Sequence, residues 1–139
     1  MSESFDDETR KALTNYRMQQ AEATLSDAEL LLANDRLNAA ANRLYYACFY
    51  ATEALLIRNG IRAATHVGVR QMFGLHFTQT GLVDAGWGRF LTRVAQLREG
   101  ADYDFFIRYD KDELSGYFPR AYEFLSVIRN LLQKDETIE

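Results

Sequence analysis

One arginine in this sequence occupies a position where its charge needs a partner. Apolar residues recur at helical spacing between Trp87 and Ala101, and on a helical wheel Arg98 falls in the middle of this stripe, beside Leu91 and Val94. Burying an unpaired guanidinium would cost several kcal/mol, so a carboxylate, an anionic ligand or a facing subunit should meet it. Arg98 is therefore the first candidate for a polar site.

Two carboxylates are candidate partners for this arginine. Asp102 lies four residues further along the same helix, and Glu53 lies on another helix across the expected bundle. Acidic and aromatic residues crowd the chain just after Asp102, beginning with Tyr103. The group is interpreted either as an ion pair that fixes the end of the helix or as the wall of a binding site.

A second polar group lies on the second predicted helix. Arg43, Tyr46, Tyr50 and Glu53 fall together almost opposite the apolar face of that helix. Two tyrosines on the outer side indicate a second buried contact, with another helix, with a second copy of the chain or with a ligand. Packing within the chain, with the hydroxyls reaching solvent, explains the pattern equally well.

The two histidines supply the imidazole groups of the chain. His66 follows Thr65 at the start of the third predicted helix, where its ring could meet an anion held by free backbone amides. His76 comes ten residues later, without the HExxH spacing of a zinc site. The single cysteine, Cys48, lies on an apolar helix face and is interpreted as a buried hydrophobe. We predict no metal site and no cofactor.

Helices must position these residues, because helical periodicity dominates the sequence. One proline and eight glycines in 139 residues are too few for the turns of an all-β domain. We expect one all-α domain over residues 1–139, an up-and-down antiparallel bundle of about five helices with frayed tails at 1–8 and 134–139. The first helix is predicted at 8–33, and the second runs from Leu37 to Leu56 and is ended by Asn59 and Gly60. The third and fourth are predicted at 66–79 and 85–103. The fifth begins at a capping box of Asp110 and Glu113 and extends through Leu132. Gly116 and Pro119 should kink or delay the first turns of the last helix.

The charge distribution leaves room for an anionic ligand. The chain carries a formal net charge of −4, which counts against a bulk electrostatic binder of nucleic acid. Residues 41–100, however, hold seven arginines against Glu53, Asp84 and Glu99, so the middle of the chain is basic. One cysteine, no apolar leader and no long apolar run favour a cytoplasmic protein without a membrane span.

Four blocks of sequence occur in order at Asn42–Leu56, Thr65–Arg70, Phe73–Leu82 and Leu97–Asp104. Together they resemble the HEPN domain family, and more narrowly its small stand-alone prokaryotic branch, over about residues 10–133. The resemblance implies a helical bundle that pairs into a homodimer. It also implies a partner, a minimal nucleotidyltransferase encoded beside it in a toxin–antitoxin arrangement.

Many members of that family are metal-independent ribonucleases, with a signature arginine followed after four to six residues by a histidine. Arg98 matches the arginine, but the window after it holds Asp102 and Tyr103 and no histidine. Arg70 and His76 fit the spacing by count, although on the third helix and outside the family's position. In related pairs the nucleotidyltransferase can modify a tyrosine beside the motif, and Tyr103 best matches that location.

Three functions are therefore considered. The first is binding of RNA, a nucleotide or a nucleotidyltransferase partner without catalysis, as one half of a toxin–antitoxin-like pair. The second is a ribonuclease in which Arg98 steadies the scissile phosphate and His66 or Asp102 acts as the base. A histidine suits that role near neutral pH, whereas an aspartate beside an arginine is held ionised. The third is a purely structural dimer. The candidate ligand-binding residues are Arg43, Tyr46, Glu53, His66, Arg98, Asp102 and Tyr103.

Overall fold

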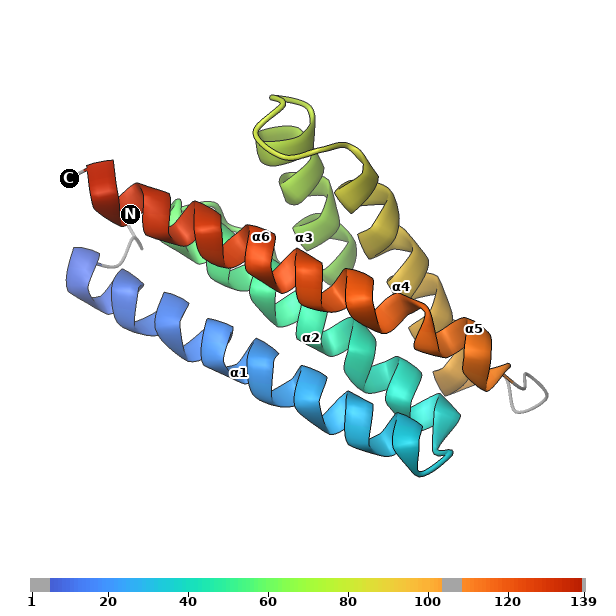
Figure 1. The fold of residues 1–139 in the computed structure, drawn as a ribbon. Coiled ribbons are helices and arrows are strands. Elements are labelled where there is room, and N and C mark those ends of the chain that lie inside the picture. The colour runs from blue at the N-terminus through green and yellow to red at the C-terminus, as the bar shows by residue number, and fades with distance from the viewer. Residues whose placement is uncertain (1–5, 104–108, 139) are drawn as a thin grey trace.

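The computed structural model describes residues 6–103 and 109–138, and within these ranges every regular element is a helix. The two longest predicted helices are α1 (Asp7–Ala33) and α2 (Leu37–Arg58). A short turn joins them, in which Asp35 adopts a positive φ of 61°. Figure 1 shows the two helices side by side and antiparallel. The described residues thus confirm the all-α class and the predicted helical hairpin.

The third predicted helix consists of two parts. α3 (His66–Phe73) continues directly into one π-helical turn, η1 (Gly74–Thr78). Thr65 caps α3 as predicted, because its Oγ1 accepts a hydrogen bond from the backbone N–H of Gly68 at 2.8 Å. Gly81 follows η1 with a φ of 81°, a left-handed conformation that favours glycine. The start of α3, which carries His66, is therefore fixed by a side-chain cap.

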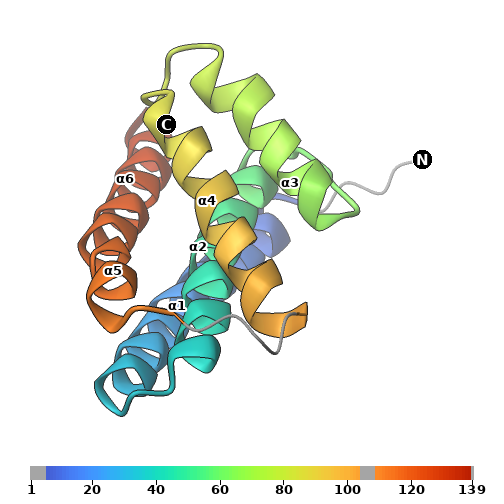
Figure 2. The ribbon, with the colours of Figure 1, turned by 90° about the vertical axis from the view of Figure 1, so that its right-hand side faces the viewer.

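The last three helices close the bundle. α4 (Gly86–Tyr103) packs across α2, and Figure 2 shows it between α6 on one side and α3 on the other. The final predicted helix is divided at Gly116 into α5 (Lys111–Ser115) and α6 (Tyr117–Ile138), which confirms the predicted interruption. Pro119 lies in the first turn of α6, where a missing N–H costs no intrahelical hydrogen bond.

The ends of the helices reach into the segments predicted as tails. α1 begins at Asp7 and the backbone of α6 stays helical to Ile138, while residues 1–5 and 139 lie outside the described ranges. No helix in those ranges combines the length and the apolar composition needed to cross a bilayer.

The central helix of the core is α2, which contacts α1, α3, α4, α5 and α6. Its buried alanines, among them Ala47 and Ala51, let the neighbouring helices approach closely. Among the described residues, Tyr45 is the largest side chain that is less than 2% exposed. Its phenol hydroxyl must find a partner inside the fold, and that partner belongs to the site described next.

Candidate functional site

Arg98 lies near the end of α4 with its side chain turned towards the bundle. The side chain is 13% exposed, and its Nη1 lies 3.4 Å from Asp102 Oδ2, one helical turn further on. Its Cζ lies 5.0 Å from the centre of the Tyr45 ring and 5.9 Å from that of Tyr46. Its Nε is buried without a hydrogen-bond partner among the described residues. The inward position predicted from the apolar stripe is confirmed.

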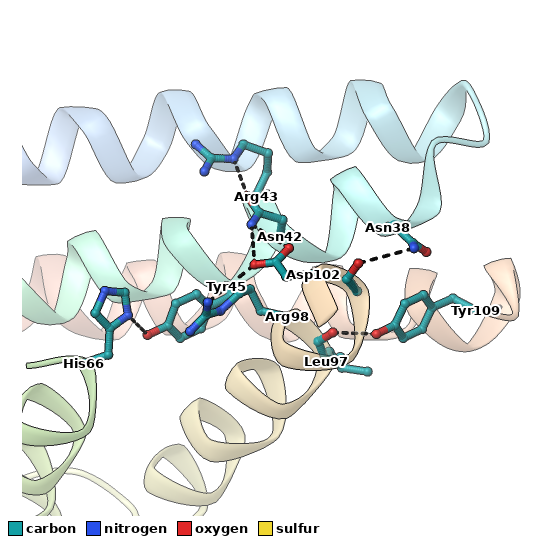
Figure 3. A network of polar contacts seen from close by, with 10 residues as sticks. Asn38, Asn42, Arg43, Tyr45, His66, Leu97, Arg98, Asp102 and Tyr109 are labelled. Atoms are coloured by element: carbon teal, nitrogen blue, oxygen red, sulfur yellow. Dashed lines mark hydrogen bonds and ion pairs between the residues drawn. The ribbon is translucent and has the colours of Figure 1, made fainter. Parts of the chain in front are cut away.

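Asp102 is held from two helices at once. Besides its ion pair with Arg98 on α4, its two carboxylate oxygens accept from Asn42 Nδ2 on α2 at 3.1 and 3.2 Å. Asn42 Oδ1 in turn accepts from Arg43 Nε at 3.0 Å, and the Arg43 Cζ lies 5.0 Å from the centre of the Tyr46 ring. Figure 3 shows Asn42 between Arg43 and Asp102. One amide thus orders a cation and an anion on the same side of α2.

His66 belongs to the same polar network although it comes from α3. Its Nδ1 lies 2.6 Å from Tyr45 Oη, as Figure 3 shows, and either atom can be the donor, depending on the tautomer. The imidazole also stacks on Phe49 with ring centres 4.3 Å apart, and it meets the edge of Tyr46. Aromatic rings therefore fix the plane of the imidazole, while the Tyr45 hydroxyl fixes its rotation.

Arg70 is the fourth member of this group and was set aside in the sequence analysis. It is half-buried on α3, and its positive charge acts on Tyr45, where it opposes the rise of the Tyr45 pKa that burial causes. The useful signal in the sequence was its spacing from His66, because residues four apart lie on the same face of a helix. We call Tyr45, His66, Arg70 and Arg98 the arginine–histidine cluster.

The cationic surroundings change the titration of the two groups between the arginines. Burial, reinforced by the charges of Arg98 and Arg70, lowers the pKa of His66, so its imidazole is neutral at pH 7. Burial raises the pKa of Tyr45, although Arg70 and Arg98 oppose this shift, so its hydroxyl stays protonated. Two guanidinium groups therefore flank two neutral groups, with Asp102 beside Arg98. An anion with several acceptor oxygens, such as a phosphate, complements this arrangement.

Glu53 does not join the cluster. Its Oε1 lies 3.3 Å from Arg17 Nε on α1, so it pairs with a residue other than Arg98. Burial raises the pKa of Glu53 despite the opposing charge of Arg17. The alternative of Glu53 as the partner of Arg98 is wrong in this structure, because Asp102 holds that position.

The remaining predicted residues lie at the edge of the cluster or away from it. Tyr46 and Arg43 line its edge, half-buried, whereas His76 is exposed on η1. Cys48 is fully buried, and burial raises the pKa of its thiol. Tyr103 ends α4, and its side chain lies outside the described part of the structure. No group of three or more metal-ligating side chains occurs within that part.

The comparison with protein families agrees with this architecture. Residues 14–131 match the HEPN domain. The chain therefore belongs to the HEPN family, which is the class that the four sequence blocks indicated.

Three relatives illustrate where the chain lies within the family. A "UPF0332 protein" of Thermotoga maritima is 34% identical over 89% of this chain and 94% of its own length. "Putative toxin MJ0605" of Methanocaldococcus jannaschii is 40% identical, over 60% of this chain and 62% of that protein. "Putative toxin MJ0142" of the same organism is 30% identical over 83% of this chain and 78% of that protein. The chain is thus similar to proteins named as toxins, and the match with the first of those two covers less than two thirds of that protein.

Proposed function

We propose that this chain binds RNA by its phosphate backbone at the arginine–histidine cluster, as the HEPN half of a toxin–antitoxin-like pair. One observation carries the proposal: Arg70 and Arg98 converge from α3 and α4 on a neutral tyrosine–histidine pair. Arginine forks match phosphate oxygens in charge and in geometry.

The net charge of the chain sets the expected strength of this binding. A protein with a formal charge of −4 repels a polyanion at long range. Binding must therefore depend on the local arginines and weaken as salt screens them. Arg43, which stacks on Tyr46 at the edge of the cluster, extends the basic surface in the direction of Asp102.

The partners belong to the same proposal. We infer a homodimer and a minimal nucleotidyltransferase partner, on the basis of family membership and of relatives named as toxins. In this scheme Tyr103 at the end of α4 is the candidate for modification by the partner. Co-purification of the neighbouring gene product, followed by mass spectrometry of Tyr103, tests this part.

RNA binding is tested with a fluorescent single-stranded RNA and three variants. Arg98→Ala and Arg70→Ala should each lower affinity about tenfold or more, as expected for the loss of a charge-assisted contact. Arg89→Ala is the matched control, because Arg89 is exposed on α4 away from the cluster and should change affinity little. If Arg98→Ala lowers only the melting temperature and leaves RNA affinity unchanged, the cluster is structural and the proposal fails.

A second candidate function, metal-independent ribonuclease activity, is favoured by the environment of His66. When His66 Nδ1 donates to Tyr45, its Nε2 carries a free lone pair, and the lowered pKa keeps the ring unprotonated at neutral pH. Such a base could take the proton of an RNA 2′-hydroxyl, whose oxygen then attacks the adjacent phosphorus. The bond to the 5′ oxygen breaks, that oxygen takes up a proton, and a 2′,3′-cyclic phosphate forms. Arg98 or Arg70 would stabilise the charge on the phosphate.

Incubation of the protein with total RNA in the presence of EDTA tests this second function. Cleavage should be abolished by His66→Ala and preserved by His76→Ala, because His76 is exposed on η1. Binding without cleavage would leave the first proposal in place and reject the ribonuclease.

A further inference from the structure

An open hollow lies beside the arginine–histidine cluster, where the end of α1, the start of α2 and the end of α4 meet. Its volume is about 350 Å³, and Leu31, Ala39 and Ala101 give it an apolar floor. Sites for small organic molecules have volumes of roughly 300–1,000 Å³. The hollow is therefore large enough for a nucleobase, and its floor offers an apolar surface against which a planar ring can pack.

The polar wall of the hollow carries one carboxylate and one guanidinium between two amides. Asn38, Asn42, Arg43 and Asp102 form this wall. Asn42 hydrogen-bonds Asp102 through Nδ2 and Arg43 through Oδ1, so both charged groups are oriented by the same side chain. Figure 3 shows this chain of contacts from Arg43 to Arg98. Since both ends of the Asn42 amide are engaged, the charged groups left to meet a ligand are the carboxylate and the guanidinium, beside the amide of Asn38, whose Nδ2 donates to the Ala101 carbonyl.

Both charged groups keep hydrogen-bonding capacity. The Asp102 carboxylate is 28% exposed, and its Oδ1 accepts only the Asn42 bond among the described residues. Within the same ranges Arg43 is engaged only through Nε and through its stacking on Tyr46, so its Nη donors remain. The wall therefore offers an acceptor-only carboxylate and a donor-only guanidinium on the two sides of Asn42.

A ligand that reaches both groups must present a donor to Asp102 and an acceptor to Arg43. Guanine does so on one edge, because its O6 acceptor adjoins the N1–H and N2–H donors. Adenine presents one amino group beside a ring nitrogen acceptor, and it lacks the second donor. Arginine contacts to guanine O6 are the commonest specific base contact of proteins. The Asp102 carboxylate would repel the O2 and N3 acceptors of cytosine, which offers it only the amino group as a donor.

We propose that this hollow binds the base of a nucleotide whose phosphate occupies the arginine–histidine cluster, and that it selects guanine. The inference rests on the proposed RNA binding. Asp102 connects the two sites, because the same carboxylate pairs with Arg98 at 3.4 Å and lines the hollow. In this arrangement the base of a nucleotide lies in the hollow and its phosphate lies at the arginine–histidine cluster, and Asp102 joins the two sites.

The test measures binding of four labelled RNA heptamers of the form CCCNCCC, which differ only in the central base. Fluorescence anisotropy at low salt should give at least about tenfold tighter binding of the guanine heptamer than of the adenine heptamer, since a good base contact contributes ~1–3 kcal/mol of discrimination. Asp102→Asn should reduce this ratio. The ratio is the informative quantity, because loss of the Arg98 ion pair lowers affinity for all four heptamers together.

A second variant fills the hollow without touching the charged groups. Ala39→Phe should bring the guanine-to-adenine ratio close to one while affinity for the cytosine heptamer stays within about twofold. Ala23→Phe, at an exposed position of α1 outside the hollow, should keep the wild-type ratio. Arg70→Ala should weaken all four heptamers equally.

The outcomes separate this inference from the proposed function. Equal, salt-dependent affinity for the four heptamers would overturn the guanine site and leave phosphate binding intact. A guanine preference that survives Ala39→Phe would also overturn the assignment to this hollow. No binding of any heptamer would overturn both.

Discussion

Tyr45 Oη lies 2.6 Å from His66 Nδ1, although the two residues are 21 positions apart in the sequence. This bond joins α2, the central helix of the core, to the first residue of α3. The phenol therefore orients the imidazole, while the charge of Arg70, also on α3, opposes the rise of the Tyr45 pKa that burial causes. The ordered state of the cluster therefore depends on one nearly inaccessible hydroxyl.

Removal of that hydroxyl should affect both stability and binding. In Tyr45→Phe the His66 imidazole loses its hydrogen-bond partner, so the free energy of unfolding should fall by about 1–3 kcal/mol. RNA affinity should also fall, because the imidazole loses the contact that fixes its orientation. Urea unfolding and RNA titration measure the two effects. Tyr16→Phe is the control, since Tyr16 is 59% exposed, and it should change neither quantity appreciably.

The stability of the protein should depend on the titration of His66 at mildly acidic pH. The pKa of His66 is lowered in the folded chain from an ordinary value of 6.5, because burial and the charges of Arg98 and Arg70 disfavour its protonation. The unfolded chain then binds more protons than the native chain in this window. Stability is therefore fully present above pH 6.5 and is lost as pH falls through the lowered pKa.

This pH dependence can be assigned with two glutamine variants. In His66→Gln the fall in melting temperature below pH 6.5 should be smaller than in the wild type, because the titrating group is absent. His76→Gln, at an exposed position, should keep the wild-type profile. Superimposable profiles for the wild type and His66→Gln would contradict the lowered pKa.

Periodicity predicted most of the fold, because burial imposes a repeat of about 3.6 residues on helices that pack on one core. The same wheel predicted the inward side chain of Arg98, which is 13% exposed. The π-helical turn of η1 was not predicted, since nothing in the spacing of residues 66–79 distinguishes it from an α-helix.

The composition of the site was harder to predict than the fold. Its partners come from helices whose relative rotation the sequence does not encode locally, so Glu53 remained a candidate for Arg98 alongside the nearer Asp102. The structure brings His66 to Tyr45 and leaves Glu53 with Arg17. Asn42 was missed because a neutral amide on a helix does not require a partner in the way that a buried charge does. In the structure it hydrogen-bonds Asp102, 60 positions away in the sequence.

Glu53 provides a prediction with the opposite sign to that of His66. Burial raises its pKa above the ordinary 4.5 despite the nearby Arg17, so the stability linked to its titration is present below pH 4.5 and is lost as pH rises through the raised pKa. Glu53→Gln stays neutral at every pH. Its melting temperature should therefore equal or exceed that of the wild type at pH 7.5, and the difference should shrink towards pH 4.5.

A matched control for Glu53 is Glu113→Gln, because Glu113 pairs with Arg93 at the surface with its side chain 62% exposed. It should leave the melting temperature almost unchanged at both pH values, as is usual for exposed ion pairs. A large loss of stability in Glu53→Gln at pH 7.5 would mean that the Arg17 pair outweighs the burial of the carboxylate.

The cap of α3 links helix stability to the proposed site. Thr65 Oγ1 accepts from the N–H of Gly68, and the eight-residue helix that it starts carries both His66 and Arg70. Thr65→Ala should lower the free energy of unfolding by about 0.5–2 kcal/mol and also weaken RNA binding, because the first turn of α3 loosens. Thr65→Ser should restore both.

Asp6→Ala is the control, because it removes the equivalent cap of α1, where Asp6 accepts from the N–H of Thr9 at 2.7 Å. It should lower stability to a similar extent without changing RNA affinity. Equal losses of RNA affinity in the two cap variants would show that binding follows global stability and is independent of the order of α3.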